Sequence, residues 1–389
     1  MTTPAPTRTR LDGLDAARAL ALAGMVLVNV GPVEPQNALH RLYLLPYGRA
    51  SILFVVIAGV GMGLMARSAR AGRGLGRIIL WRAALLLVGG LALQLLSDDV
   101  SIILPLYGLL FLLALPLRRL PTRGLLAVAG VMTVLGPVAY VMHGVLEDTK
   151  HLTAPPRLDD PLLDVLHGLV LSGRYPLVTW VVPFIIGLVL ARLNLRDQQL
   201  LRRIVVVGGV TAVAGFLLSQ ATRSILAREA DIGYARLLTG AAHGQMPLWL
   251  LSSVGGALFV IAGALLLAPR AGRLTAHAAT VGRMALTLYV LHVLVIAAVQ
   301  PPDGFTIAQG AAVTVVLVAT LALFALGWSR FAPLGPLETV LRAEWLRPPV
   351  PTVPTPASAP TTAAGPTASR ETAPLPDARP TTKPGEPSV

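Results

Sequence analysis

A stretch near the N-terminus carries polar side chains at positions where they would be costly inside a lipid bilayer. Residues 11–40 read LDGLDAARALALAGMVLVNVGPVEPQNALH. The polar positions are Asp15 and Arg18 at the start of an apolar run, Asn29 at its end, and His40 after a proline-containing loop. Charged groups near the bilayer core are tolerated mainly where they face protein or a cavity. The stretch therefore predicts one wall of a site that is reached from both sides of a membrane.

The two ends of this stretch favour different chemistry. Asp15 and Arg18 are three residues apart and share a helix face. They are either a snorkelling pair at the end of a span, or a polar plug or an anion site at its cytoplasmic mouth. His40 is either a surface loop histidine or a base or nucleophile, because neutral imidazole is available near pH 7.

Three further segments carry candidate polar groups. Arg49 begins the second apolar run, at its outer end, and is either an interfacial anchor or a pocket residue. His243 lies in AAHGQMP, just before the eighth run. His292 lies inside an apolar run near Tyr289, and a histidine at that depth needs a hydrogen-bonding partner. We predict His40 as the catalytic residue, and as substrate-pocket residues Asp15, Arg18, Asn29, Arg49, His243, Tyr289 and His292.

The segment GRGLGR at 72–77 is a flexible arginine cluster. It is not a P-loop, because it lacks G-x-x-x-x-G-K-[ST]. Arg73 and Arg77 either hold the phosphates of a cofactor at the inner face or only determine topology. The chain has no cysteine and no H-E-x-x-H spacing, so no metal site is predicted.

Composition indicates a membrane protein. The 389 residues are 54% hydrophobic and 13% charged, whereas a soluble domain has about 25% charged residues. Long apolar runs recur along the chain, so we predict an all-α, polytopic membrane helix bundle with the lipid bilayer as its partner. The net charge of +13 comes largely from arginines in short loops, which argues against a nucleic-acid partner. No oligomeric state is predicted.

Ten apolar runs have approximately the length that crosses a bilayer. They are 14–33, 49–66, 78–97, 101–117, 124–146, 174–193, 203–221, 246–268, 280–299 and 306–328. Arginines concentrate after the second, fourth, sixth and eighth runs, so these loops are expected to be cytoplasmic. With ten spans both termini are then cytoplasmic, Asp15 and Arg18 lie at the inner end of the first span, and Asn29 and His40 lie at the outer face.

The runs divide the chain into five parts. These are a cytoplasmic N-terminus at 1–13, a transmembrane region at 14–146, an extracytoplasmic loop at 147–173, a second transmembrane region at 174–346 and a cytoplasmic tail at 347–389. The tail is rich in proline and poor in large apolar residues, which predicts disorder.

Local patterns add two structural predictions. In the outer loop, Asp160 followed by Pro161 predicts the start of an amphipathic helix on the membrane interface. Its apolar face is formed by Leu162, Leu163, Leu166, Leu169 and Val170. Gly59 and Gly63, together with the pairs 89–90 and 255–256, predict close helix–helix approaches.

The chain resembles a known group of membrane proteins. RLDGLDAARALALAGMVLVNVGP resembles the opening of bacterial YeiB-like proteins, which pair an acyltransferase-like N-terminal region with a C-terminal domain of unknown function. It is also similar to the first span of heparan-α-glucosaminide N-acetyltransferases. Asp15, Arg18, Val28 and Asn29 match that pattern, and Ala19 stands where glycine is usual.

Further segments carry the same resemblance. GRASILFVVIAG at 48–59 resembles the second span of the family. The segments that resemble the C-terminal domain are GRYPLVTW at 173–180, AAHGQMP and the residues after it to Gly255, GRMALTLYVLHVL at 282–294, and GPLETVLR at 335–342.

The resemblance implies a YeiB family protein of the bacterial plasma membrane, from a branch without a settled activity. It would be acyltransferase-like over 14–146 and YeiB-like over 174–346. In the acetyltransferases, acetyl-CoA binds from the cytoplasm, and a histidine in the outer loop after the first span passes the acetyl group to an amine on the far side. His40 lies in the corresponding loop. The expected donor is therefore acyl-CoA, and the acceptor an extracytoplasmic glycan or lipid.

Two other classes of function remain open. A transporter or flippase would move a small molecule or a lipid-linked substrate along the same polar wall without acyl transfer. A scaffold would recruit a partner through the proline-rich tail.

Overall fold

The computed structural model describes residues 11–33, 38–67, 74–97, 100–146, 155–226, 233–241, 243–342 and 344–346. Within these ranges the chain forms helices and no strand, which confirms the all-α fold. The described residues belong to one compact unit. The predicted tail, 347–389, lies outside the described residues.

The helical elements follow the apolar runs of the sequence. They are α1 (Asp12–Val30), α2 (Ala38–Tyr43), α3 (Arg49–Arg67), α4 (Leu75–Gln94), α5 (Leu104–Leu117), α6 (Thr122–Leu146), α7 (Leu162–His167), the π-helical turn η2 (Gly168–Ser172), α8 (Leu177–Leu190), α9 (Gln198–Leu226), the 3-10 turn η4 (Gly233–Leu238), α10 (Pro247–Arg283), α11 (Ala285–Val299), α12 (Ile307–Trp328), α13 (Pro336–Arg342) and the 3-10 turn η5 (Glu344–Leu346).

Seven helices among the described residues are long and apolar enough to cross a membrane: α1, α3, α4, α6, α9, α10 and α12. The segment formed by α7 and η2 is bent by 58° against α8, and the pair would make an eighth span. Two shorter apolar helices, α5 and α11, have 14 and 15 residues. The protein is therefore a multi-pass membrane protein, whereas ten spans and two cytoplasmic termini stay predictions.

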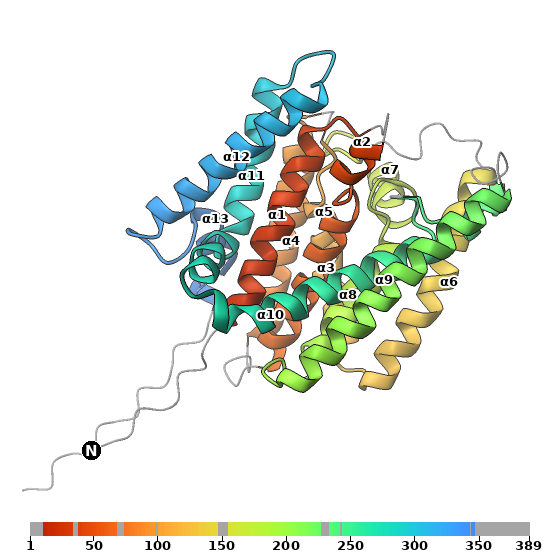
Figure 1. The fold of residues 1–389 in the computed structure, drawn as a ribbon, viewed down its shortest axis with the longest axis horizontal. Helices are drawn as coiled ribbons and strands as arrows, with labels where there is room; N and C mark the ends of the chain where they lie inside the picture. Colours follow the sequence, from red (N-terminus) through yellow and green to blue (C-terminus); the bar gives the residue numbers. More distant parts are fainter. Residues whose placement is uncertain are drawn as a thin grey trace, which may run out of the picture. The chain divides into compact units, whose positions relative to one another are not determined.

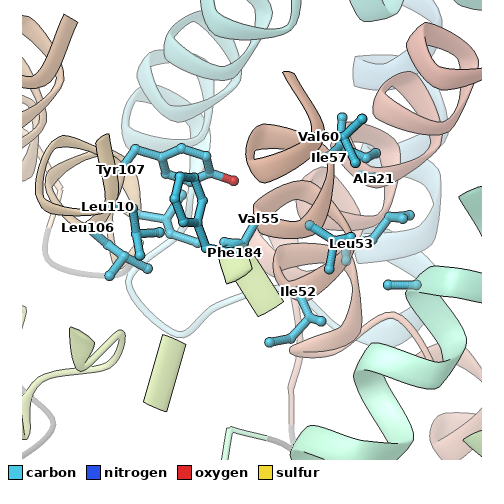
Figure 2. Packing of buried hydrophobic residues seen from close by; sticks show 14 of the residues in the cluster. Ala21, Ile52, Leu53, Val55, Ile57, Val60, Leu106, Tyr107, Leu110 and Phe184 are labelled. Carbon is cyan, nitrogen blue, oxygen red and sulfur yellow. The ribbon is translucent and has the colours of Figure 1, made fainter. Parts of the chain in front are cut away.

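Helix α1 packs against helices from both predicted transmembrane regions. It contacts α3 from the first region and α10, α11 and α12 from the second (Figure 1, α1 in red). The core continues through α3, whose Ile52 and Val55 are fully buried, to Leu110 of α5 and Phe184 of α8 (Figure 2). The two regions therefore share one hydrophobic core.

Glycines allow α3 and α8 to approach closely. A Cβ atom on Gly59 would lie 2.2 Å from the carbonyl oxygen of Phe184, and one on Gly187 would lie 2.1 Å from that of Val56. A Cβ atom on Gly63 would meet Ala191 at 2.5 Å. The prediction for Gly59 and Gly63 is confirmed.

For the other two glycine pairs, the prediction of a close helix approach holds for only one glycine of each pair. A Cβ atom on Gly90 would clash with Pro105, and one on Gly255 with the backbone of α9. Gly89 and Gly256 instead face open space, since a Cβ atom on either would have nothing within 4 Å. Adjacent residues point 100° apart on a helix, so only one member of each pair can face the neighbouring helix.

The end of α10 differs from the expected loop between the runs 246–268 and 280–299. The helix continues to Arg283 with a break at Gly272, whose backbone angles are φ 45° and ψ −110°. Residues with a side chain rarely adopt a positive φ, so glycine permits the break. Helix α11 then begins after Met284.

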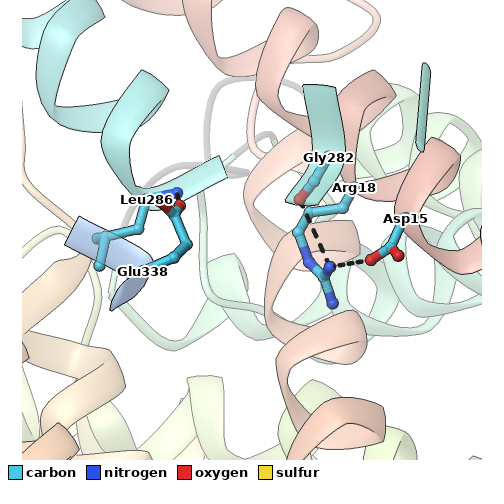
Figure 3. Close-up of polar contacts among 5 residues, drawn as sticks. All are labelled: Asp15, Arg18, Gly282, Leu286 and Glu338. Atoms are coloured by element: carbon cyan, nitrogen blue, oxygen red, sulfur yellow. Dashed lines mark hydrogen bonds and ion pairs between the residues drawn. The ribbon is translucent and has the colours of Figure 1, made fainter. Parts of the chain in front are cut away.

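Helix α13 stabilises the start of α11. The Glu338 carboxylate accepts a hydrogen bond from the backbone N–H of Leu286 at 2.6 Å (Figure 3). It also accepts from the backbone N–H of Thr287 at 3.1 Å and from the Thr287 hydroxyl at 2.6 Å. A carboxylate satisfies amide groups at a helix N-terminus and interacts favourably with the helix dipole. The motif GPLETVLR therefore holds α11 in place.

The predicted amphipathic helix of the outer loop exists, but its cap is different. Helix α7 begins at Leu162 without a side-chain cap, and the Asp160 carboxylate accepts from the backbone N–H of Arg157 at 2.7 Å. Leu162 and Leu163 are exposed, whereas Leu169 is buried. Asp160 thus stabilises the preceding turn, and the exposed leucines suit a membrane interface.

Candidate functional site: two polar cavities at the ends of α1

The predicted polar residues of α1 lie at two separate cavities. We call the end of the bundle that carries Asp15 and Arg18 the inner end and the end that carries Asn29 the outer end, following the predicted orientation. Asn29 follows Arg18 by eleven positions, which corresponds to about 16 Å along an α-helix.

The inner cavity has a volume of about 720 Å³ and is rich in arginine. Arg18 Nη1 donates to Asp15 Oδ1 at 2.5 Å and to the Gly282 carbonyl at 3.5 Å (Figure 3). The other charged residues of the wall are Arg67, Arg192 and Arg196. One carboxylate against four guanidinium groups leaves an excess of positive charge, which favours an anionic ligand.

Of the two predicted cofactor arginines, Arg77 is described and does not line this wall. It is exposed in the first turn of α4. Arg73 lies outside the described residues. Arg67, Arg192 and Arg196 belong to arginine-rich segments for which the sequence predicts only a cytoplasmic location. Arg67 is the last residue of α3, and Arg192 and Arg196 lie shortly after α8; this was the available clue, since α3 and α8 pack together.

Asn29 and His292 meet at the outer end. Asn29 Nδ2 lies 2.9 Å from His292 Nε2, so the amide donates and Nε2 accepts, which places the proton of the neutral ring on Nδ1. The ring centroid of Tyr289 lies 4.8 Å from that of His292, and the Tyr289 hydroxyl accepts from the Ile103 N–H at 3.2 Å. The predicted partner of this deep histidine therefore comes from α1.

An outer cavity of about 230 Å³ opens beside this cluster. Its walls include Asn29, His243, Arg174, Tyr175 and Asp303. Asn29, Tyr175 and His243 also line a narrow void of about 10 Å³, together with Tyr289 and Ser51. That volume corresponds to roughly one water molecule. Three predicted pocket residues, Asn29, His243 and Tyr289, thus come together at one polar void.

His243 is enclosed by aromatic rings. Its ring stacks on Trp249 with centroids 6.0 Å apart and lies 4.8 Å from Tyr47 and 5.7 Å from Tyr175. Its buried Nδ1 has no hydrogen-bond partner among the described residues. Burial, and secondly the positive charge of Arg174, lower the pKa of His243 to about 3. The imidazole is therefore neutral at physiological pH.

Gln245 holds the loop that carries His243. Its Oε1 accepts from Trp180 Nε1 at 2.8 Å and from Thr179 Oγ1 at 3.0 Å, and its Nε2 donates to the Arg174 carbonyl at 3.0 Å. His243 and Gln245 both have a positive φ, 55° and 63°. Such a conformation is uncommon for residues with side chains and persists where the surroundings enforce it. Three residues of this region, Gln245, Arg174 and Asp303, are not among the site residues predicted from the sequence.

Two predicted site residues lie elsewhere. His40 is 1% exposed in α2 and lines neither the inner nor the outer cavity. Arg49 lies at the start of α3 and lines a third cavity on the side of the bundle. The inner and outer cavities share no lining residue, and the buried side chains of Leu22, Met25 and Val26 lie between them along α1.

Comparison with known proteins bears on the C-terminal half. Residues 189–346 match a protein family of unknown function, DUF418. No curated protein matches the chain. The DUF418 match begins within α8 and extends to η5. It therefore contains His243, Gln245, Tyr289, His292 and Glu338, whereas Asp15, Arg18 and Asn29 precede it.

Replacing Gln245 in the DUF418 region with leucine should destabilise the protein. The substitution leaves the Trp180 indole N–H and the Arg174 carbonyl without their partner, whereas the Thr179 hydroxyl still donates to the Pro176 carbonyl at 3.1 Å. Each unsatisfied buried group costs about 1–3 kcal/mol. Thermal unfolding in detergent should show a clear decrease in melting temperature. Gln199→Leu, at an exposed position of α9, is the matched control. Equal melting temperatures for the two variants would contradict this role of Gln245.

Proposed function

We propose that the protein is an acyltransferase of the bacterial plasma membrane that uses cytoplasmic acyl-CoA as donor and an extracytoplasmic glycan or lipid as acceptor. The observation that carries the proposal is the pair of cavities at opposite ends of α1. The inner cavity carries excess positive charge, and the outer cavity carries a neutral, buried histidine with an unpartnered nitrogen. The resemblance of α1 to the first span of the N-acetyltransferases agrees with this division.

The inner cavity suits the donor. CoA carries phosphate groups, for which arginine is a favoured partner because it offers several donors in a planar fork. A volume of about 720 Å³ lies within the usual range for small-molecule sites, about 300–1,000 Å³. Arg67, Arg192 and Arg196 are the proposed phosphate-binding residues. Arg67 and Arg192 also bond backbone carbonyls, those of Ala191 and Leu120, which holds both side chains in place.

The outer cavity suits the acceptor. In acyl transfer, an amine or hydroxyl attacks the thioester carbonyl, the C–S bond breaks, and the CoA thiolate leaves. His243 would take the proton that the attacking group loses and return it to the thiolate. We prefer His243 to His40 for this role because His243 lines the outer cavity. Because the acceptor attacks the thioester directly, the thioester end of CoA would have to reach the outer cavity through the apolar layer around Met25, so α1 and its neighbours must separate during turnover.

Release of CoA thiol tests the proposal. The purified protein is reconstituted in liposomes and given acetyl-CoA on the side of the inner cavity and glucosamine on the other side. We expect free thiol and acetylated amine in equal amounts, and no thiol without the protein. Absence of thiol release with acetyl-CoA and with longer acyl-CoA donors, for both a glycan amine and a lipid acceptor, would overturn the proposal.

A transporter or flippase is the second candidate. Two cavities that share no residue and are separated by an apolar layer also fit a site that opens alternately to each side of the membrane. The same liposomes distinguish the two functions. A transporter moves a labelled substrate across the bilayer without releasing CoA thiol.

Neutralising one inner arginine should weaken donor binding. For Arg196→Gln we expect the KM for acyl-CoA to rise about tenfold with little change in kcat, because the lost charge contact stabilises bound substrate and transition state alike. Steady-state kinetics of thiol release measures both constants. Arg203→Gln, at an exposed position of α9 outside the cavity wall, is the control. A tenfold rise in both variants would indicate a general charge effect rather than a binding site.

A further inference from the structure

A third cavity forms a groove on the side of the bundle. It has a volume of about 560 Å³ and lies between α1, α3, α9 and α10. Nearly all of its lining side chains are apolar; they include Leu20, Leu53, Val213, Phe216, Phe259 and Val260. Leu20, Val213 and Phe259 are 58%, 58% and 48% exposed. In a membrane-spanning bundle, such a surface is in contact with lipid chains.

The groove has free space at a defined position. Gly256 of α10 lines it, and a Cβ atom on Gly256 would have no atom within 4 Å. Gly255, its neighbour, is packed against α9 instead. The absence of a side chain at Gly256 therefore leaves the groove open at this position.

Arg49 supplies a positive charge at the outer end of the groove. Its Nη1 donates to the Leu45 carbonyl at 3.3 Å, in the turn before α3. Among the described residues no carboxylate forms an ion pair with Arg49. A guanidinium group has five N–H donors, so most of its capacity remains for an anion.

The groove borders the polar void at the outer end. Pro46 and Ala50 line both cavities. On the groove side of these two residues lies Arg49, and on the other side lie Asn29, His243 and Tyr289. Only the turn before α3 and the first turn of that helix therefore separate the lipid-facing surface from His243.

We propose that this groove binds a lipid with an anionic phosphate head group, with one acyl chain along α1 and α10 and the phosphate on Arg49. An amphiphile held in this way has its chain in the bilayer and its head group beside the outer cavity. If the proposed acyl transfer is correct, the lipid is the acceptor, and the groove is its lateral access route to His243.

Lipid retention tests the site directly. The protein is purified from nanodiscs that contain equal amounts of phosphatidylglycerol and phosphatidylcholine, and bound lipid is counted by native mass spectrometry. Gly256→Phe fills the groove, and Gly263→Phe is the matched control. Gly263 lies two turns further along the same helix, also has no atom within 4 Å of a Cβ position, and does not line the groove. Arg49→Gln removes the positive charge and Arg49→Lys keeps it.

We expect the wild type and Gly263→Phe to retain phosphatidylglycerol in preference to phosphatidylcholine. Gly256→Phe should lose at least half of the retained lipid, and Arg49→Gln should lose the preference that Arg49→Lys keeps. Equal retention by the two phenylalanine variants, at equal melting temperatures, would overturn the groove site. Equal preference in Arg49→Gln and the wild type would overturn the role of Arg49. If the groove retains lipid but the protein releases no CoA thiol, the proposed acyl transfer would be excluded and the proposed lipid-binding groove would still be supported.

Discussion

Replacement of His243 by alanine is expected to lower the rate of acyl transfer by about 100-fold or more, because a positioned general base contributes about 10²–10⁴-fold. The substitution removes the unpartnered nitrogen from the outer cavity. Thiol release in the liposome assay measures the effect, and acyl-CoA binding at the inner cavity should be unchanged.

Two other histidines make the result specific. His40→Ala tests the residue that the sequence analysis assigned as the base, and it should retain most of the activity because His40 lines neither cavity. His277→Ala changes an exposed position of α10 and should be neutral. Loss of activity in His40→Ala but not in His243→Ala would show that His40, and not His243, is the general base.

The pH dependence follows from the same environment. The folded-state pKa of His243 is about 3, against 6.5 for an ordinary histidine. As the pH falls, His243 therefore becomes protonated near pH 6.5 in the unfolded chain but only near pH 3 in the folded protein. The contribution of His243 to stability is fully present above about pH 6.5 and decreases as the pH falls towards 3.

The pH dependence of the rate follows from the same pKa. Between about pH 5 and 8 the His243 ring stays neutral, so its titration should not change the rate of acyl transfer. Melting curves and rates at several pH values check both statements.

Replacement of Gly59 by leucine is expected to prevent correct packing of α3 against α8. A Cβ atom alone would lie 2.2 Å from the Phe184 carbonyl and 3.0 Å from the Cα of Gly187. Both atoms belong to the backbone, so no side chain can move aside. Overpacking of a core costs about 1–3 kcal/mol and more where the backbone must shift, so we expect little folded protein by size-exclusion chromatography.

Gly61→Leu is the matched control for this packing. It lies in the same helix, two residues further on, and a Cβ atom there would have nothing within 4 Å. Folded yields that are equal for Gly59→Leu and Gly61→Leu would show that the two helices can separate without loss of the fold.

Much of the fold could be predicted because lipid imposes a simple rule on the sequence. Apolar runs of the right length become helices, since every backbone polar group must be satisfied within the membrane. The runs therefore mark the helices well. They do not show whether a 14-residue helix such as α5 crosses the membrane, nor that α10 continues through Gly272 to Arg283.

The site was harder to predict because its residues are far apart in the chain. Asn29 and His292 are separated by 263 positions, and no local pattern shows that they meet. The need of His292 for a partner was predictable from its depth, but the identity of that partner was not. Gln245 was missed because its importance lies in three contacts with residues 174–180.

The Glu338 contact limits how the bundle can open. Helix α13 is attached to α11 through Glu338 and to α4 through Arg82, whose Nε donates to the Leu341 carbonyl at 3.0 Å. These hydrogen bonds tie α4, α11 and α13 together at the inner end, and α11 carries Tyr289 and His292. If the proposed acyl transfer requires the two cavities to connect, we expect α1 and α10 to move against α4, α11 and α13, with the backbone break at Gly272 as the hinge.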